Sequence, residues 1–277
     1  MRVYQIAMLS NIALLASELG RTTGAIGVGI GGSRALGLNR CDSDWDLVLI
    51  FEQERTVPPT ELRRVLQPFC DPGSLQILGR YLTGACRGEK IEIFQKSTPT
   101  IRTELERARR GEFGWKVAPL FAHGDLSTRL LSHIQMMKIA WQRNNELSKL
   151  QESLLPFPQE LRKSLSEYFC TRAAECLFHL RKLRAEPRMF EAISCFSAFV
   201  AYTSIAIYAV NCLYPVLEKG RDAILQTLST KPGDYSSRLL RSFELIQTND
   251  MSSAIEILDR VLSELKGIMA TMNRANA

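Results

Sequence analysis

Strand signals and helix signals occupy different parts of this chain, and this separation constrains the fold more than any other feature. Short apolar runs beside glycines indicate strands early in the chain, at 25–30, 46–50, 75–78 and 90–94. After residue 122 the apolar residues recur at helical spacing almost throughout. The sequence therefore predicts an α+β fold, in which a mixed sheet with helices (residues 1–122) precedes an all-α helical bundle (residues 123–277).

Apolar periodicity and terminating Gly or Pro residues also predict the individual helices. In the first part they are expected at 3–19, in a short piece after Ser33, at 61–67 and at 100–110. In the second part they are expected at 126–139, 141–154, 158–184, 189–213, 217–229, 235–247 and 252–272.

The composition is that of a globular protein with a core of useful size. Hydrophobic residues make up 45% and charged residues 23% of 277 residues, which excludes a long disordered chain. The formal net charge of +6 comes without a block of Lys and Arg, so it suits a small polyanionic ligand at least as well as RNA. Seven cysteines without a CxxC pair or zinc-type His spacing favour reduced thiols and a cytoplasmic protein.

One segment, residues 192–217, carries no charge and is long enough to cross a bilayer. Polar residues such as Ser194, Ser197, Thr203 and Asn211 interrupt it at frequent intervals. A helix that is buried on all sides in a bundle has this composition. We expect a core helix and no membrane partner.

The residues best suited to chemistry lie between Gly31 and Asp46. Asp44 and Asp46 are two residues apart at the start of the strand-like run 46–50. Residues at i and i+2 of a strand share one face, so both carboxylates can reach one metal ion. Mg²⁺ is bound in proteins by one or two carboxylates together with substrate phosphates. The spacing predicts a magnesium site, with one Mg²⁺ ion or, as we expect, two, that can bind the phosphates of a substrate.

A glycine turn precedes the two aspartates. Gly31 and Gly32 allow a backbone to approach phosphates closely, because they have no Cβ. Ser33 follows at the start of a predicted short helix, where its hydroxyl and the free N–H groups can meet a phosphate oxygen. Arg34 and Ser43 are further candidates for nucleotide binding, and solvent exposure is the alternative for Arg34.

A third acid is expected from another strand. Glu92 lies between two isoleucines in the run 90–94, so strand alternation turns it away from the core. It can complete metal coordination or accept the proton of an attacking hydroxyl. Glu89, at the turn before this strand, is a weaker rival.

These residues carry a resemblance. GGSRALG followed by SDWDLVL, with ten residues between Ser33 and Asp44, resembles the signature of the DNA polymerase β-like nucleotidyltransferase superfamily. A compact domain followed by a helical one is similar to the antibiotic-type branch, as in kanamycin nucleotidyltransferase. Only 31–46 carries the motif; the rest of the chain resembles the family in architecture.

The resemblance implies roles for individual residues. Gly32 and Ser33 would hold the triphosphate, Asp44 and Asp46 would bind Mg²⁺, and Glu92 would be the third acid. In some relatives the base is a Glu from the helical domain, and Glu175 is the matching candidate here. The implied reaction is transfer of a nucleoside monophosphate, with ATP as the favoured donor, to a hydroxyl of a small molecule, with release of pyrophosphate.

Two alternatives remain open. A macromolecular acceptor, such as a tRNA end or a protein hydroxyl, would make the chain similar to toxin-type relatives. A module that binds nucleotides without turnover would keep the fold and lose the chemistry. The acceptor, the preferred base of the nucleotide and the oligomeric state are not determined by the sequence.

Overall fold

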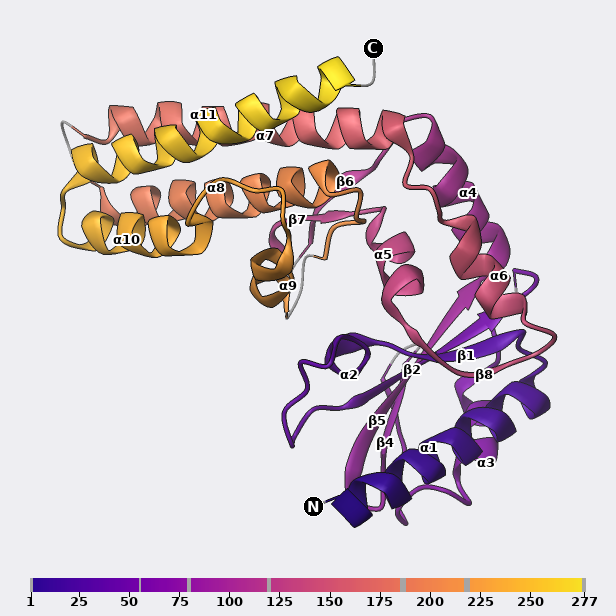
Figure 1. The fold of residues 1–277 in the computed structure, drawn as a ribbon. Coiled ribbons are helices and arrows are strands. Elements are labelled where there is room, and N and C mark those ends of the chain that lie inside the picture. Colours follow the sequence, from indigo (N-terminus) through magenta and orange to yellow (C-terminus); the bar gives the residue numbers. More distant parts are fainter. Residues whose placement is uncertain are drawn as a thin grey trace. The chain divides into compact units, whose positions relative to one another are not determined.

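A computed structural model describes residues 2–54, 56–78, 81–118, 121–184, 188–216 and 220–275. Side chains are described for the same residues except 2–10, 117–118, 121–123, 273 and 275. Contacts divide the chain into two compact units (Figure 1). The first, here called the sheet unit, comprises Met1–Glu106 and Leu130–Pro156; the second, the helical unit, comprises Arg107–Arg129 and Phe157–Ala277.

The sheet unit contains a six-stranded mixed sheet in the order β3-β4-β5-β2-β1-β8. Only β2 and β5 run parallel among its neighbouring pairs, and the other pairs are antiparallel. The strands are β1 (Gly27–Ile30), β2 (Trp45–Phe51), β3 (Gln76–Leu78), β4 (Tyr81–Cys86), β5 (Glu89–Ser97) and β8 (Lys138–Gln142). The helices that begin in this part of the chain are α1 (Arg2–Thr23), α2 (Gly32–Leu36), α3 (Pro59–Leu66), α4 (Thr98–Arg109), α5 (Arg129–Met136) and α6 (Glu146–Ser153).

One face of this sheet carries the main core of the unit. Helices α1 and α3 pack against it (Figure 1), and the buried cluster includes Leu15, Leu19 and Leu62 from these helices together with Leu47 and Ile93 from the strands. Alternation along β2 and β5 therefore directs odd-numbered residues into this cluster and even-numbered residues to the opposite face.

The opposite face of β1 is covered at very short range, and this requires glycine. A Cβ on Gly29 would lie 2.3 Å from Sδ of Met137, and one on Gly27 would lie 2.8 Å from the Leu147 side chain in α6. Gly27 and Gly29, which lie inside the predicted strand 25–30, are thus the strand positions on which later residues pack.

The helical unit is built around four long helices. They are α7 (Gln159–Lys182), α8 (Met189–Val210), α10 (Tyr235–Gln247) and α11 (Met251–Ala275), with a short α9 (Arg221–Thr227). Contacts join α7 to α8 and α11, and α10 to α8 and α11 (Figure 1). Two-thirds of the most apolar stretch of α8 (67%) is buried inside the protein, in agreement with the interpretation as a core helix.

A two-stranded hairpin belongs to this unit as well, formed by β6 (Trp115–Ala118) and β7 (Phe121–Leu126). The Trp115 ring packs edge-on against Phe169 of α7 and Tyr202 of α8, at centroid distances of 6.2 and 5.9 Å. Gly124, with φ +98, makes room for this ring, because a Cβ there would lie 1.9 Å from the indole Nε1.

The α+β class with a mixed sheet and a helical C-terminal region is confirmed, but three details of the sequence prediction are wrong. Residues 81–86, between the predicted strands 75–78 and 90–94, form strand β4, which the sequence did not predict; its interior Gly84 accommodates the Leu75 side chain, which a Cβ would meet at 2.7 Å. Residues 138–142 form strand β8 where the ends of two helices were expected, and β7 extends past residue 122. The C-terminal part is therefore not all-α.

The domain boundary that the sequence predicts after residue 122 remains a prediction. In its contacts, the chain passes from the sheet unit to the helical unit after Glu106, returns at Leu130 and leaves again after Pro156.

Candidate functional site

The structure brings Asp46 and Glu92 together on neighbouring strands. The parallel register of β2 and β5 pairs Asp46 directly with Glu92. Both residues are partly exposed, while Leu47 and Ile91 beside them are fully buried at 0% exposure. Since paired residues of adjacent strands point to the same side, the two carboxylates share the face opposite the core cluster.

Asp44 precedes β2 by one residue and is also partly exposed. Among the side chains that the structure describes, no group of three or more His, Cys, Asp or Glu residues is arranged to hold a metal ion. Asp46 and Glu92, here called the acidic row, are thus neighbours, but the described structure does not bring Asp44 into one metal-holding group with them. An oxygen-only, incomplete set of this kind fits Mg²⁺, which relies on substrate phosphates and water for its remaining ligands. The metal itself stays a prediction.

The glycine turn lies against the Asp46 carboxylate. The Gly31 N–H donates to the carbonyl of Asp46 at 2.8 Å, which extends the pairing of β1 with β2. Gly32 has φ +58, a left-handed conformation that favours glycine, and a Cβ there would lie only 1.8 Å from Oδ2 of Asp46. Gly32 is therefore required both by its backbone and by the carboxylate beside it.

Ser33 stands in the first turn of α2, after the Gly31 N-cap. Its hydroxyl makes no hydrogen bond within the described part of the chain, and the residue is partly exposed. The first N–H groups of a helix have no acceptor inside the helix. The turn thus presents a hydroxyl and backbone donors beside Asp46, and the binding of a phosphate by these groups remains a prediction.

Arg34 and Ser43 contact their own chain. The Arg34 guanidinium donates to the carbonyl oxygens of Ser43 and Asp44 and to the carboxylate of Glu89, and the Ser43 hydroxyl accepts the Arg40 N–H at 2.8 Å. A nucleotide contact by Arg34 or Ser43 remains a prediction. Glu89, the rival for the third acid, is held in an ion pair with Arg34 at 2.8 Å.

Two polar residues that sequence reasoning did not select lie in the same region. Thr83 of β4 is the register partner of Glu92 and extends the polar row to a third strand. Lys138 of β8 is the partner of Ile30, and its exposed ammonium donates to the Arg34 carbonyl at 3.0 Å, at the glycine turn. Lys138 lies in a segment that the sequence predicts as a helix. A prediction of β8 as a strand would have been needed to place Lys138 beside Ile30 and the glycine turn.

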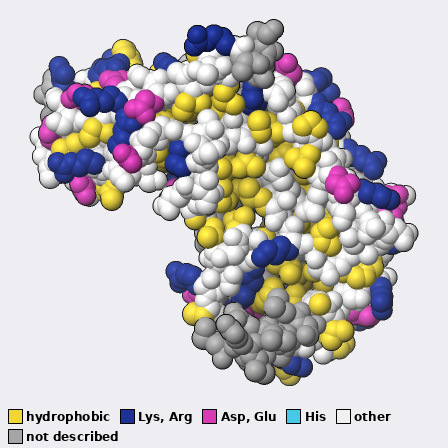
Figure 2. Space-filling model, viewed as in Figure 1, with side chains coloured by type: hydrophobic (Ala, Val, Ile, Leu, Met, Phe, Trp, Pro, Cys, Tyr) yellow, Lys and Arg dark blue, Asp and Glu magenta, His cyan; other side chains and the backbone are white. Residues whose placement is uncertain are grey.

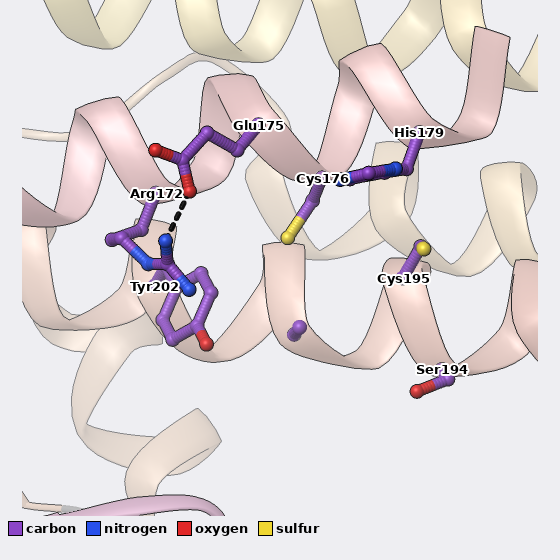
Figure 3. Close-up of a pocket in the computed structure, with 8 residues that line it drawn as sticks. Arg172, Glu175, Cys176, His179, Ser194, Cys195 and Tyr202 are labelled. Carbon is purple, nitrogen blue, oxygen red and sulfur yellow. Dashed lines mark hydrogen bonds and ion pairs between the residues drawn. The ribbon is translucent and has the colours of Figure 1, made fainter. Parts of the chain in front are cut away.

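Glu175, the alternative base, lies on α7 in the helical unit and forms an ion pair with Arg172 (Figure 3). It lines a cavity of about 260 Å³ between α7 and α8. The residues around the cavity are Arg172, Glu175, Cys176, His179, Ser194, Cys195, Ala198 and Tyr202.

Small side chains of α8 (Ser194, Cys195 and Ala198) open this cavity opposite the longer side chains of α7 (Figure 3). Burial raises the pKa of the Cys176 thiol to about 11, so this thiol is protonated at neutral pH. The role of Glu175 as a base remains a prediction.

All seven cysteines are free thiols, in agreement with the expectation of reduced cysteines. On the face drawn in Figure 2, Lys and Arg side chains are interspersed with Asp and Glu over the helical unit.

Comparison with known proteins gives a structural likeness and no match in sequence. No protein-family model matches the sequence, and no curated protein matches it. Among solved structures, the chain is similar to a nucleotidyltransferase-like protein from Exiguobacterium sibiricum 255-15, with 12% sequence identity and a TM-score of 0.44. The similarity covers 97% of this chain and 80% of that chain. At this identity and TM-score the likeness carries no argument about function, which has to come from the site.

Proposed function

We propose that the sheet unit is a Mg²⁺-dependent nucleotidyltransferase that transfers a nucleoside monophosphate, with ATP as the favoured donor, to a hydroxyl of a small molecule. The observation that carries this proposal is the contact between the glycine turn and the acidic row: Gly32 leaves no room for a side chain beside Asp46, and Asp46 is in register with Glu92. A phosphate-binding turn and two carboxylates are the parts that this chemistry needs.

In the proposed reaction, the acceptor oxygen attacks the α-phosphorus, a new O–P bond forms, and the bond to pyrophosphate breaks. Asp44 and Asp46 would hold the divalent cation, with Glu92 as the third acid. When bound, the cation supplies positive charge that stabilises the negative charge developing on the phosphates. The proton of the acceptor hydroxyl would pass to a carboxylate, for which Glu92 is the first candidate and Glu175 the alternative.

The backbone donors and hydroxyl of Gly32 and Ser33 would bind the triphosphate, and the exposed Lys138 ammonium would add a charge-assisted contact at the same turn. In this arrangement the hydrogen-bond donors and the Lys138 ammonium would contact the triphosphate, and the carboxylates would contact the divalent cation bound to it. Membership of the antibiotic-type branch, as in kanamycin nucleotidyltransferase, is a more specific form of this proposal.

The test measures transfer of label from α-³²P nucleoside triphosphates in the presence of Mg²⁺, with pools of small hydroxyl compounds and with total RNA as separate acceptors. Asp46→Asn and Asp44→Asn should abolish transfer. Asp42→Asn is the matched control, because Asp42 lies in the same loop, is exposed, and pairs only with Arg40 in the described contacts. It should keep full activity.

The outcomes separate the alternatives. Labelled RNA, with no labelled small molecule, would replace the small-molecule acceptor by a macromolecule. Tight nucleotide binding without any transfer would favour the non-catalytic module. Full activity in Asp46→Asn would overturn the proposal itself.

A further inference from the structure

The side chain of Arg34 reaches from α2 to two other segments of the sheet unit, residues 43–45 and the start of β5. Its Nε donates to the carbonyl oxygens of Ser43 and Asp44, at 3.1 Å each. Its Nη2 donates to the Ser43 carbonyl at 2.5 Å and to the Glu89 carboxylate at 2.8 Å. Three of the five N–H donors of the guanidinium are thereby used inside the protein.

The guanidinium is also enclosed. It lies over the ring of Trp45, 4.1 Å from the ring centroid, and the side chains of Arg34 and Glu89 are only 13% and 20% exposed. Charge-assisted hydrogen bonds of this kind are about twice as strong as neutral ones, and a cation over an indole adds attraction. These contacts restrict the Arg34 side chain more than the side chain of an exposed, ligand-binding arginine is restricted.

The anchoring points coincide with the segments that carry the acids. The carbonyl of Asp44 is itself an acceptor, Trp45 is the residue between Asp44 and Asp46, and Glu89 begins the strand that contains Glu92. Arg34 follows the glycine turn after one intervening residue, Ser33. One side chain therefore ties the phosphate-binding turn to both acidic strands.

We propose that Arg34 is a positioning residue, which sets the Asp44 backbone and the start of β5 against the glycine turn. This inference rests on the proposed function, because the geometry that it fixes is that of the predicted cation and nucleotide site. It differs from the sequence expectation that Arg34 binds the nucleotide directly, since the charge of Arg34 is already paired with Glu89.

Arg34→Lys separates a positioning role from a direct phosphate contact. Lysine keeps the positive charge that a phosphate would attract, but its single ammonium does not reproduce the planar fork that reaches two carbonyls and a carboxylate. A positioning role predicts that the charge alone does not restore the site. A phosphate contact predicts that lysine preserves much of the nucleotide affinity.

The experiment measures binding of Mn²⁺ to the full-length protein in the presence of ATP, by electron paramagnetic resonance, and binding of ATP without a divalent cation, by calorimetry. In Arg34→Lys we expect the Mn²⁺ affinity to fall by about 10- to 100-fold, the range for residues that orient metal ligands. The affinity for ATP in the absence of metal should change by less than about threefold, because lysine keeps the positive charge at position 34.

Two further variants complete the design. Glu89→Gln removes the ionic partner but leaves both carbonyl contacts of Arg34, so it should weaken Mn²⁺ binding in the same direction by a smaller factor. Arg40→Lys is the matched control, because Arg40 lies in the adjacent loop, is 80% exposed in its side chain, and pairs with Asp42. It should bind Mn²⁺ as the unmodified protein does.

Each outcome has one meaning. If the unmodified protein binds neither ATP nor Mn²⁺–ATP, the proposed function fails. If it binds both and Arg34→Lys binds Mn²⁺ equally well, the positioning role fails while the proposed function stands. If Arg34→Lys loses metal-free ATP affinity by as large a factor as it loses Mn²⁺ affinity, the positioning role is also overturned. If Arg34→Lys does not fold, Glu89→Gln decides: unchanged Mn²⁺ affinity in that variant refutes the inference.

Discussion

Replacing Gly32 by Ala should disturb the site more than its small size suggests. At φ +58, an alanine in the left-handed region costs about 1–2 kcal/mol relative to glycine. The new Cβ would also stand 1.8 Å from Oδ2 of Asp46, so the carboxylate has to leave its present rotamer. An off-rotamer side chain costs about 0.5–1.5 kcal/mol, which brings the expected destabilisation to about 1.5–3.5 kcal/mol.

Gly37 provides a control in the same segment. It has φ +71, yet nothing lies within 4 Å of the position of an added Cβ. Gly37→Ala should therefore cost only the backbone part, about 1–2 kcal/mol. Alanine also lowers the conformational entropy of the unfolded chain, but this effect is common to both variants and cancels in the comparison.

The assay is urea unfolding followed by circular dichroism, paired with calorimetry of Mg²⁺–ATP binding. Gly32→Ala should be less stable than Gly37→Ala by about 0.5–1.5 kcal/mol, and it should lose Mg²⁺–ATP affinity as severely as Asp46→Ala does. Gly37→Ala should keep that affinity. Equal stability of the two alanine variants, together with normal binding by Gly32→Ala, would refute the contact between the turn and Asp46.

Three further predictions concern stability. Tyr235→Phe removes a buried hydrogen bond of 2.7 Å to Thr203 and should lower the free energy of unfolding by about 0.5–1.5 kcal/mol in urea. Burial raises the pKa of Cys170 to about 12, above its value in the unfolded chain, so its contribution to stability is complete below about pH 9 and is lost as the pH rises toward 12. The stability of Cys170→Ala, measured by urea unfolding from pH 7 to 11, should consequently fall less steeply than that of the unmodified protein; parallel curves would contradict this assignment. Gly84→Ala would place a Cβ 2.7 Å from Cδ2 of Leu75 and should cost about 1–3 kcal/mol, seen as a lower midpoint of thermal unfolding.

The sequence predicted the elements whose signals are local. Neighbouring residues are enough to recognise the i, i+2 spacing of Asp44 and Asp46, the glycines before them and the alternation around Glu92. In the structure, the register of β2 with β5 pairs Asp46 with Glu92. The long apolar helices of the second half were also recognisable, because their periodicity extends over many turns.

The missed elements depend on residues far away in the chain. Strand β8 spans five residues and is stabilised by pairing with β1, more than 100 positions earlier, so its own composition gave no strand signal. Strand β4 contains Gly84, which looks like a turn until Leu75 is seen to occupy the space of the absent side chain. The contacts of Arg34 likewise join residues 34, 43 and 89, whose proximity exists only after β2 and β5 have paired.

The position of β8 in the sequence, long after its pairing partner β1, affects how the sheet can fold during synthesis. During synthesis, β1 precedes β8 by more than 100 residues, and its outer edge and the face with Gly27 and Gly29 are completed only by residues 137–147. Until those residues leave the ribosome, a nascent sheet would expose an unpaired edge and an uncovered apolar face, both of which favour aggregation. A chain that stops at residue 122 should therefore depend on chaperones or precipitate, whereas one that continues through α6 should not.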